Sequence, residues 1–148
     1  MANPLYISYT HLSTYQQCPL KYKFHFIDGL GTLYRQERPY FSFGGSIHQT
    51  LAKFFKIENL SFRTVDVLQK LLQQSWISKG YASKEEEADW KSQALSVLEK
   101  FYNTADIKVK PLYTEDFFRI SAGDNILAGR IDRIDKTEDG YEIIDYKT

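Results

Sequence analysis

The chain ends in GRIDRIDKTEDGYEIIDYKT, the stretch Gly129–Thr148, and this stretch decides the fold that we predict for its C-terminal part. Apolar and polar residues alternate on both sides of the turn-forming segment 137–140, which is typical of two strands joined in a hairpin. With the turn centred in that segment, Asp132 lies directly opposite Asp145. Since side chains alternate between the two faces of a strand, Lys147 shares the face of Asp145.

Two opposed carboxylates need a cation between them, because directly opposed Cβ atoms are only about 4.5–5.5 Å apart. A divalent metal ion fits Asp132 and Asp145, since Mg²⁺ is typically held by one or two carboxylates together with substrate phosphates. Lys147 would then orient a water or stabilise charge on a phosphate. The alternative is that both acids are solvated or pair with Arg130 and Arg133. A one-residue slip of the register would also turn Asp132 to the other face.

The rest of the chain predicts helices first and strands last, which is an α+β arrangement. Helical spacing and capping residues predict helices over 11–17, 19–26, from Gly44 onward, over 65–80 and after Ser83, with a loop over 30–42. Alternating patterns predict strands over 113–122, 126–136 and 141–147. We therefore expect one domain over 1–148, with a helical part (1–112) and a three-stranded antiparallel meander (113–148) that carries the site.

The composition is that of a globular protein. The chain has 148 residues, no net charge, and 10 Phe, 11 Tyr and 2 Trp, which argues against disorder. Zero net charge gives no overall attraction to nucleic acid, so a nucleic-acid site must be a local patch. No stretch has the roughly 18 apolar residues of a membrane span, and there is no signal-peptide pattern. Because the one cysteine, Cys18, forms no internal disulfide, we expect a cytoplasmic protein without membrane contact.

Four motifs occur in order along the chain: C-P-x-x-Y after an upstream serine, G-x-x-x-H, G-R-I-D and D-Y-K-T, at Ser8–Tyr22, Gly44–His48, Gly129–Asp132 and Asp145–Thr148. Together they resemble the PD-(D/E)XK nuclease superfamily over residues 7–148, and within it the RecB-like exonuclease branch. This resemblance implies a restriction-endonuclease-like core and metal-dependent hydrolysis of DNA, at single strands or duplex ends, in repair or recombination. D-Y-K alone is a weak signal, whereas the ordered set is specific.

The resemblance also implies roles for single residues. Asp132 and Asp145 would be the two catalytic acids and Lys147 the catalytic lysine. Mg²⁺ or Mn²⁺ would be bound by His48, Asp132, Asp145, the backbone carbonyl of Tyr146 and, as an outer ligand, Glu115. On the residues alone, His48 also fits a packing role on its helix. Glu115 likewise fits a solvated acid at the edge of a strand.

Two expectations concern the segment that follows the catalytic lysine in members of this family. In the family the sheet and a helix continue after the lysine, so we expect an incomplete nuclease domain that by itself need not cut DNA. Some members also hold an iron–sulfur cluster through one N-terminal and three C-terminal cysteines. A cluster needs four thiolates, so Cys18 would serve one only together with three further C-terminal cysteines. Otherwise Cys18 is a buried, unreactive thiol.

Rival functions remain open at this point. The same fold could bind nucleic acid without cutting it, or serve as a docking module for a helicase subunit of a repair complex, through an exposed sheet edge. Aromatic side chains near the start of the chain could stack on bases or form core: Tyr15, Tyr22, Phe24 and Phe26. Basic residues near them could contact phosphates: Lys21, Lys23, Arg35 and Arg38.

Overall fold

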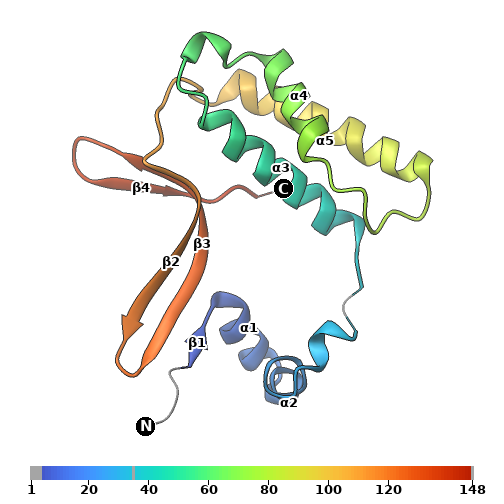
Figure 1. The fold of residues 1–148 in the computed structure, drawn as a ribbon, viewed down its shortest axis with the longest axis vertical. Coiled ribbons are helices and arrows are strands. Elements are labelled where there is room, and N and C mark those ends of the chain that lie inside the picture. Colours follow the sequence, from blue (N-terminus) through green and yellow to red (C-terminus); the bar gives the residue numbers. More distant parts are fainter. Residues whose placement is uncertain (1–4, 35, 148) are drawn as a thin grey trace. The chain divides into compact units, whose positions relative to one another are not determined.

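The computed structural model describes residues 5–34 and 36–147 (Figure 1). They form two compact units, which we describe separately. The N-terminal unit holds the chain up to Gln36 together with Phe117–Arg130. The core unit holds Glu37–Asp116 together with the chain from Ile131 onward.

Three helices build the core unit and lie side by side in Figure 1: α3 (Pro39–Phe55), α4 (Val65–Ser75) and α5 (Lys84–Thr104). A short 3-10 turn, η3 (Leu60–Phe62), precedes α4. The apolar faces of these helices form one buried cluster of Phe43, Ile47, Leu51, Phe54, Phe55, Leu68, Leu72, Ala94 and Leu98. Burial of this apolar surface is the main stabilising contribution to the unit.

Helix α3 begins at Pro39, five residues before the predicted start at Gly44. Proline is favoured in the first helical turn, because its missing N–H would have no partner there. Within α3, the buried hydroxyls of Ser46 and Thr50 each donate to the carbonyl four residues earlier, at 2.7 Å. The Ser46 hydroxyl also accepts the N–H of Ile77 at 3.0 Å. These bonds and the burial around them outweigh the poor helix propensity of Gly44 and its neighbour.

Capping residues begin the other two helices of the core unit. The Ser83 side chain accepts the N–H of Glu86, so the predicted start of α5 is confirmed. Thr64 caps α4 in the same way. However, α4 ends at Ser75 and not at residue 80, because Trp76 turns into an extended conformation and donates its indole N–H to Glu87 at 2.8 Å.

The sheet has four strands and is mixed, so the predicted three-stranded antiparallel meander is wrong. Strand β3 (Asn125–Lys136) pairs with β2 (Tyr113–Ala122) and β4 (Tyr141–Ile144). It also pairs in parallel with β1 (Tyr6–Ile7), which faces Ile126 and Leu127. The two residues of β1 are too few to show alternation in the sequence, and only the tertiary structure reveals the strand.

The register of the predicted hairpin is confirmed where β3 pairs with β4. Arg133 faces Ile144 and Lys136 faces Tyr141, as expected for a turn centred within 137–140. The strand is shorter than predicted, since β4 ends at Ile144. Asp145 therefore lies outside the ladder of hydrogen bonds.

The N-terminal unit contains short helices: α1 (Tyr9–Gln17), α2 (Pro19–Tyr22), a π-helical turn η1 (Lys23–Ile27) and a 3-10 turn η2 (Leu30–Thr32). Ser8 caps α1, and the ring of His11 accepts the Ser8 N–H at 3.2 Å, completing a reciprocal capping box. No described residue of this unit is fully buried. Across residues 5–34 and 36–147, no helix combines the length and apolarity needed to cross a bilayer.

Candidate metal centre

Three elements of the core unit bring one imidazole and two carboxylates together. His48 comes from α3, Glu115 from β2 and Asp132 from β3. The Nδ1 atom of His48 lies 3.0 Å from Asp132 Oδ1 and 3.6 Å from Glu115 Oε1. One ligand atom from each residue lies within 4.8 Å of the others. The three side chains thus form a compact set of nitrogen and oxygen donors.

The cluster is shielded from solvent without being sealed. The exposed fractions of the side chains are 24% for His48, 17% for Glu115 and 10% for Asp132. Partial burial strengthens the repulsion between two carboxylates, because fewer waters screen them. It equally strengthens their attraction for a cation, and the remaining exposure leaves a path for a ligand to enter.

A backbone donor fixes the second oxygen of Asp132. The N–H of Tyr146 donates to Asp132 Oδ2 at 2.8 Å, while Oδ1 faces His48. Carboxylates that bind metals are commonly oriented by such outer hydrogen bonds. The contact also shows that the chain just after β4 returns to the cluster.

Glu115 has an unusual backbone conformation. Its φ is +52°, and among the described residues it is the one non-glycine residue with a positive φ. This left-handed conformation is disfavoured for residues with a Cβ atom and is enriched at functional sites. We interpret it as strain that accompanies the placement of the Glu115 carboxylate in the cluster.

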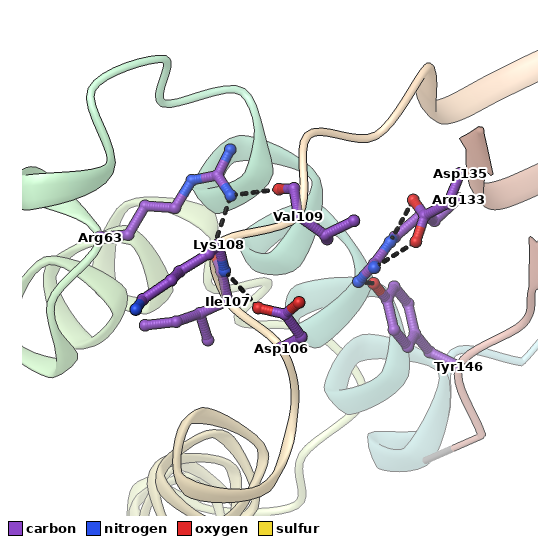
Figure 2. A network of polar contacts seen from close by, with 8 residues as sticks. All are labelled: Arg63, Asp106, Ile107, Lys108, Val109, Arg133, Asp135 and Tyr146. Atoms are coloured by element: carbon purple, nitrogen blue, oxygen red, sulfur yellow. Dashed lines mark hydrogen bonds and ion pairs between the residues drawn. The ribbon is translucent and has the colours of Figure 1, made fainter. Parts of the chain in front are cut away.

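A buried ion pair, Arg133 with Asp135, lies on the same strand as Asp132, and Figure 2 shows this pair beside Tyr146. The guanidinium of Arg133 donates two hydrogen bonds to the carboxylate of Asp135, one of them at 2.8 Å. It also donates to the Tyr146 hydroxyl at 3.4 Å and lies 4.3 Å from the ring centre of Phe55. Burial raises the pKa of Tyr146, an effect that Asp135 and Asp132 reinforce and Arg133 opposes. The hydroxyl therefore stays protonated at neutral pH.

Arg63 holds the segment that leads from α5 into β2. Its guanidinium donates to four backbone carbonyls, those of Phe55, Ile57, Ile107 and Val109, at 2.6–3.1 Å. Figure 2 shows the bonds to Ile107 and Val109. Because this segment runs directly into β2, Arg63 helps to set the position of Glu115. Burial and the nearby Arg133 lower the pKa of Arg63. Sequence analysis missed this residue, since a buried arginine on a loop has no distinguishing pattern.

The structure brings together three of the predicted site residues and leaves two apart. His48, Glu115 and Asp132 meet, whereas Asp145 is exposed and forms an ion pair with Lys147. The register would place Asp145 opposite Asp132, one pair beyond the last pair of the ladder, so the predicted ligand role of Asp145 stays a prediction. For Tyr146 the structure gives a role to the N–H, and the predicted role of its carbonyl stays a prediction.

Cys18 belongs to the N-terminal unit. It is half-buried, and not buried as predicted, and its sulfur caps α2 by accepting the N–H of Lys21 at 3.4 Å. The group of possible ligands around His48 contains no cysteine. The structure thus gives Cys18 a capping role.

Comparison with known proteins gives one match. The family model described as the PD-(D/E)XK nuclease superfamily matches residues 6–148, nearly the whole chain. Neither the curated proteins nor the solved structures gave a match.

Proposed function

The chain belongs to the PD-(D/E)XK nuclease superfamily, and we propose that His48, Glu115 and Asp132 hold the divalent metal ion on which its activity depends. Membership of this superfamily implies a metal-dependent nuclease, a hydrolase that acts on phosphodiesters, with DNA as substrate. The observation that carries the proposal is the convergence of one imidazole and two carboxylates from three elements.

The three residues fit a single ion in size and chemistry. Oxygen ligands on opposite sides of Mg²⁺ lie about 4 Å apart, close to the 4.8 Å within which the three ligand atoms lie. Two carboxylates suit Mg²⁺, and the addition of a neutral imidazole suits Mn²⁺ as well. We therefore propose Mg²⁺ or Mn²⁺ as the cofactor.

A bound divalent ion would lower the pKa of a water and offset the negative charge of the scissile phosphate. The protein's own contribution is to hold the donors in place. Asp132 is anchored by the Tyr146 N–H, and His48 is fixed by the packing of α3. Little reorganisation is then needed when the substrate arrives, which favours catalysis.

We further propose that Asp145 completes the ligand set and that Lys147 stabilises charge on the phosphate. Two observations support this. Continuing the register of β3 and β4 by one pair would place Asp145 opposite Asp132. The next residue, Tyr146, already contacts Asp132 through its N–H. Both side chains are exposed, so a change of rotamer is open to them.

The finer assignment is to the RecB-like exonucleases, with a role in DNA repair or recombination. It rests on the upstream motifs C-P-x-x-Y and G-x-x-x-H in addition to the catalytic strands. The histidine of the second motif is His48, a member of the cluster. We expect degradation from a DNA end, and circular single-stranded DNA to resist cleavage.

The test is cleavage of linear DNA by the purified protein with Mg²⁺ or Mn²⁺ and after chelation. We expect cleavage that needs the metal and that Asp132→Asn abolishes. Asp139→Asn, an exposed acid of the neighbouring turn, is the matched control and should cut like wild type. Cleavage that survives chelation or Asp132→Asn would refute the proposal.

One observation favours a second function, nucleic-acid binding without catalysis. Asp145 and Lys147 pair with each other and lie outside the cluster, as expected if they had no catalytic role. This alternative predicts DNA binding without cleavage at any metal concentration. A loss of cleavage rate in Lys147→Gln, with unchanged metal affinity, would exclude it.

A further inference from the structure

The neutral chain is made of two units with opposite charge. The N-terminal unit contains five basic and two acidic residues, which gives it a net charge of +3. The basic residues are Lys21, Lys23, Arg35, Arg119 and Arg130, and the acidic ones are Asp28 and Asp124. The core unit holds the other 14 basic and 17 acidic residues, a net charge of −3. A basic unit attracts a polyanion locally even though the chain as a whole does not.

The same unit exposes many of its aromatic rings. Six Tyr and Phe side chains of this unit are exposed: Tyr6, Tyr9, Tyr15, Phe24, Tyr34 and Phe117. Exposed rings among basic residues are the composition of surfaces that bind single-stranded nucleic acids, where bases stack on rings and cations meet phosphates. A partner of this chemistry fits both the charge and the rings.

Some of these rings line a pocket of about 590 Å³ within the unit. Phe24, His25 and Tyr34 supply rings, Leu20 and Leu30 supply apolar surface, and Lys21 supplies a positive charge. The volume falls within the roughly 300–1,000 Å³ that is usual for ligand sites. A flat apolar base with an attached phosphate matches this lining of rings and one ammonium group.

The pocket is partly preformed. The ring of His25 packs on Phe26 with 4.5 Å between ring centres, and it lies so close to Gly31 that a Cβ there would be 2.2 Å from Nδ1. Gly31 therefore allows the loop to approach the ring. Lys23 forms an ion pair with Asp28 at 2.6 Å and lies over the ring of Phe24, which orders that side of the pocket.

We propose that this pocket takes an unpaired base of a single-stranded nucleic acid, with Tyr34 stacking on the base and Lys21 contacting its phosphate. The choice of ligand rests on the proposed nuclease function, which makes nucleic acid the substrate. It goes beyond that function, because it assigns single-strand binding to residues of the N-terminal unit that take no part in metal binding.

The test is fluorescence anisotropy with labelled oligo(dT) in a chelating buffer, so that binding is measured without cleavage. We expect Tyr34→Leu to weaken binding by about 5- to 100-fold, the loss typical of removing one stacking ring. Tyr34→Phe keeps the ring and should bind like wild type. Lys21→Gln should lower the salt dependence of binding, since one phosphate contact is lost.

The matched control is Tyr141→Leu. Tyr141 is a tyrosine of the core unit with an exposed fraction of 69%, against 79% for Tyr34. This substitution should leave oligo(dT) binding unchanged. A strand of abasic sites should bind more weakly than oligo(dT), and a duplex of the same length should not lose affinity in Tyr34→Leu.

Three results would overturn the proposal: no binding of oligo(dT), equal affinities of Tyr34→Leu and Tyr141→Leu, or equal binding of the abasic strand. Equal binding of the abasic strand would mean that the protein recognises phosphates alone. A lack of oligo(dT) binding would mean that the pocket binds another partner, such as a peptide. Cleavage of DNA by Tyr34→Leu at saturating substrate is measured in parallel. If the oligo(dT) tests fail while metal-dependent cleavage is intact, only the proposed base pocket is refuted. If oligo(dT) binding depends on Tyr34 but no cleavage is found, only the nuclease function is refuted.

Discussion

The core unit and the N-terminal unit differ in how fully they bury apolar side chains and in the sign of their charge. The core unit has a buried cluster of large apolar side chains, in which Phe54, Leu68 and Leu72 are inaccessible to solvent. The N-terminal unit buries none of its described residues fully and exposes rings such as Tyr9 and Tyr34. The core unit is acidic and holds the candidate metal centre of His48, Glu115 and Asp132, whereas the N-terminal unit is basic.

This difference shows why the net charge of a chain is a poor guide to its partners. The net charge of zero argued against binding to nucleic acid, yet it is the sum of a positively charged unit and a negatively charged one. Acidic residues around a metal site attract cations and repel phosphates, so a nuclease benefits from basic residues elsewhere. We infer that the core unit carries the phosphodiester hydrolysis and that the N-terminal unit binds the single-stranded nucleic acid.

The largest expected effect compares two histidines. His48→Ala should lower metal-dependent cleavage by about 100-fold or more, since it removes a ligand of an ion worth several kcal/mol to the transition state. His11→Ala, in the N-terminal unit, should cost about 1 kcal/mol of helix stability through the lost capping box and leave the affinity for Mn²⁺ unchanged. Cleavage rates at saturating DNA measure this difference. Equal losses of cleavage rate in both variants would contradict the proposal that the chemistry belongs to the core unit alone.

A second comparison uses two aspartates. Asp135→Asn breaks the buried pair with Arg133 and should lower the free energy of unfolding by about 3–5 kcal/mol. Asp124→Asn, at an exposed turn of the N-terminal unit, should change it by at most about 0.5 kcal/mol. Urea unfolding curves report both values. A small effect of Asp135→Asn would show that the Arg133 charge is solvated and not buried.

Two leucines compare apolar packing. Leu72→Ala opens a cavity in the core cluster and should cost about 2–5 kcal/mol of stability. Leu33→Ala, at a highly exposed position of the N-terminal unit, should cost about 0.5 kcal/mol or less. Thermal unfolding of the two variants checks this. If Leu33→Ala lowered the stability as much as Leu72→Ala, the N-terminal unit would have a packed interior of its own.

The smallest effect concerns pH. Burial, with Glu87 and Glu86 nearby, raises the pKa of Tyr81. The folded state then holds this proton to higher pH than the unfolded state, which releases it near pH 10, so stability falls as pH rises above about 10. The Tyr81 hydroxyl is buried with no hydrogen-bond partner among the described residues.

Tyr81→Phe should therefore be as stable as wild type or up to about 1 kcal/mol more stable at neutral pH. It should also lose less stability between neutral and alkaline pH. Tyr34→Phe, at an exposed ring, should follow the wild-type profile. A Tyr81→Phe variant that is less stable at neutral pH would mean that the hydroxyl has a partner such as an ordered water.

Local signals were readable from the sequence, and contacts between distant segments were not. The register of β3 and β4 followed from a short polar turn between alternating segments, and the start of α5 followed from Ser83 and the acids after it. Strand β1 was missed because it depends on a tertiary partner, β3. The early start of α3 at Pro39 was missed because Gly44 and its neighbour suggested a later start.

The candidate site shows the same limit. His48 and Asp132 were named from motifs and Glu115 from the family resemblance. Their meeting in one place depends on contacts between α3, β2 and β3, which lie far apart in the sequence. The register agrees with the predicted pairing of Asp132 with Asp145, but β4 ends one residue before Asp145, and the Asp145 side chain pairs with Lys147. The support from Arg63 and from Arg133 with Asp135 was invisible, because in the sequence buried charges look like surface charges.

The most direct test of the metal centre compares two neighbouring acids by calorimetric titration with Mn²⁺. Glu115→Gln removes a proposed ligand, while Asp116→Asn changes the next residue, which is exposed. We predict one Mn²⁺ site in the wild type and in Asp116→Asn, and at least about tenfold weaker binding in Glu115→Gln. Wild-type affinity in Glu115→Gln, or an equal loss in both variants, would contradict the assignment of the metal to His48, Glu115 and Asp132.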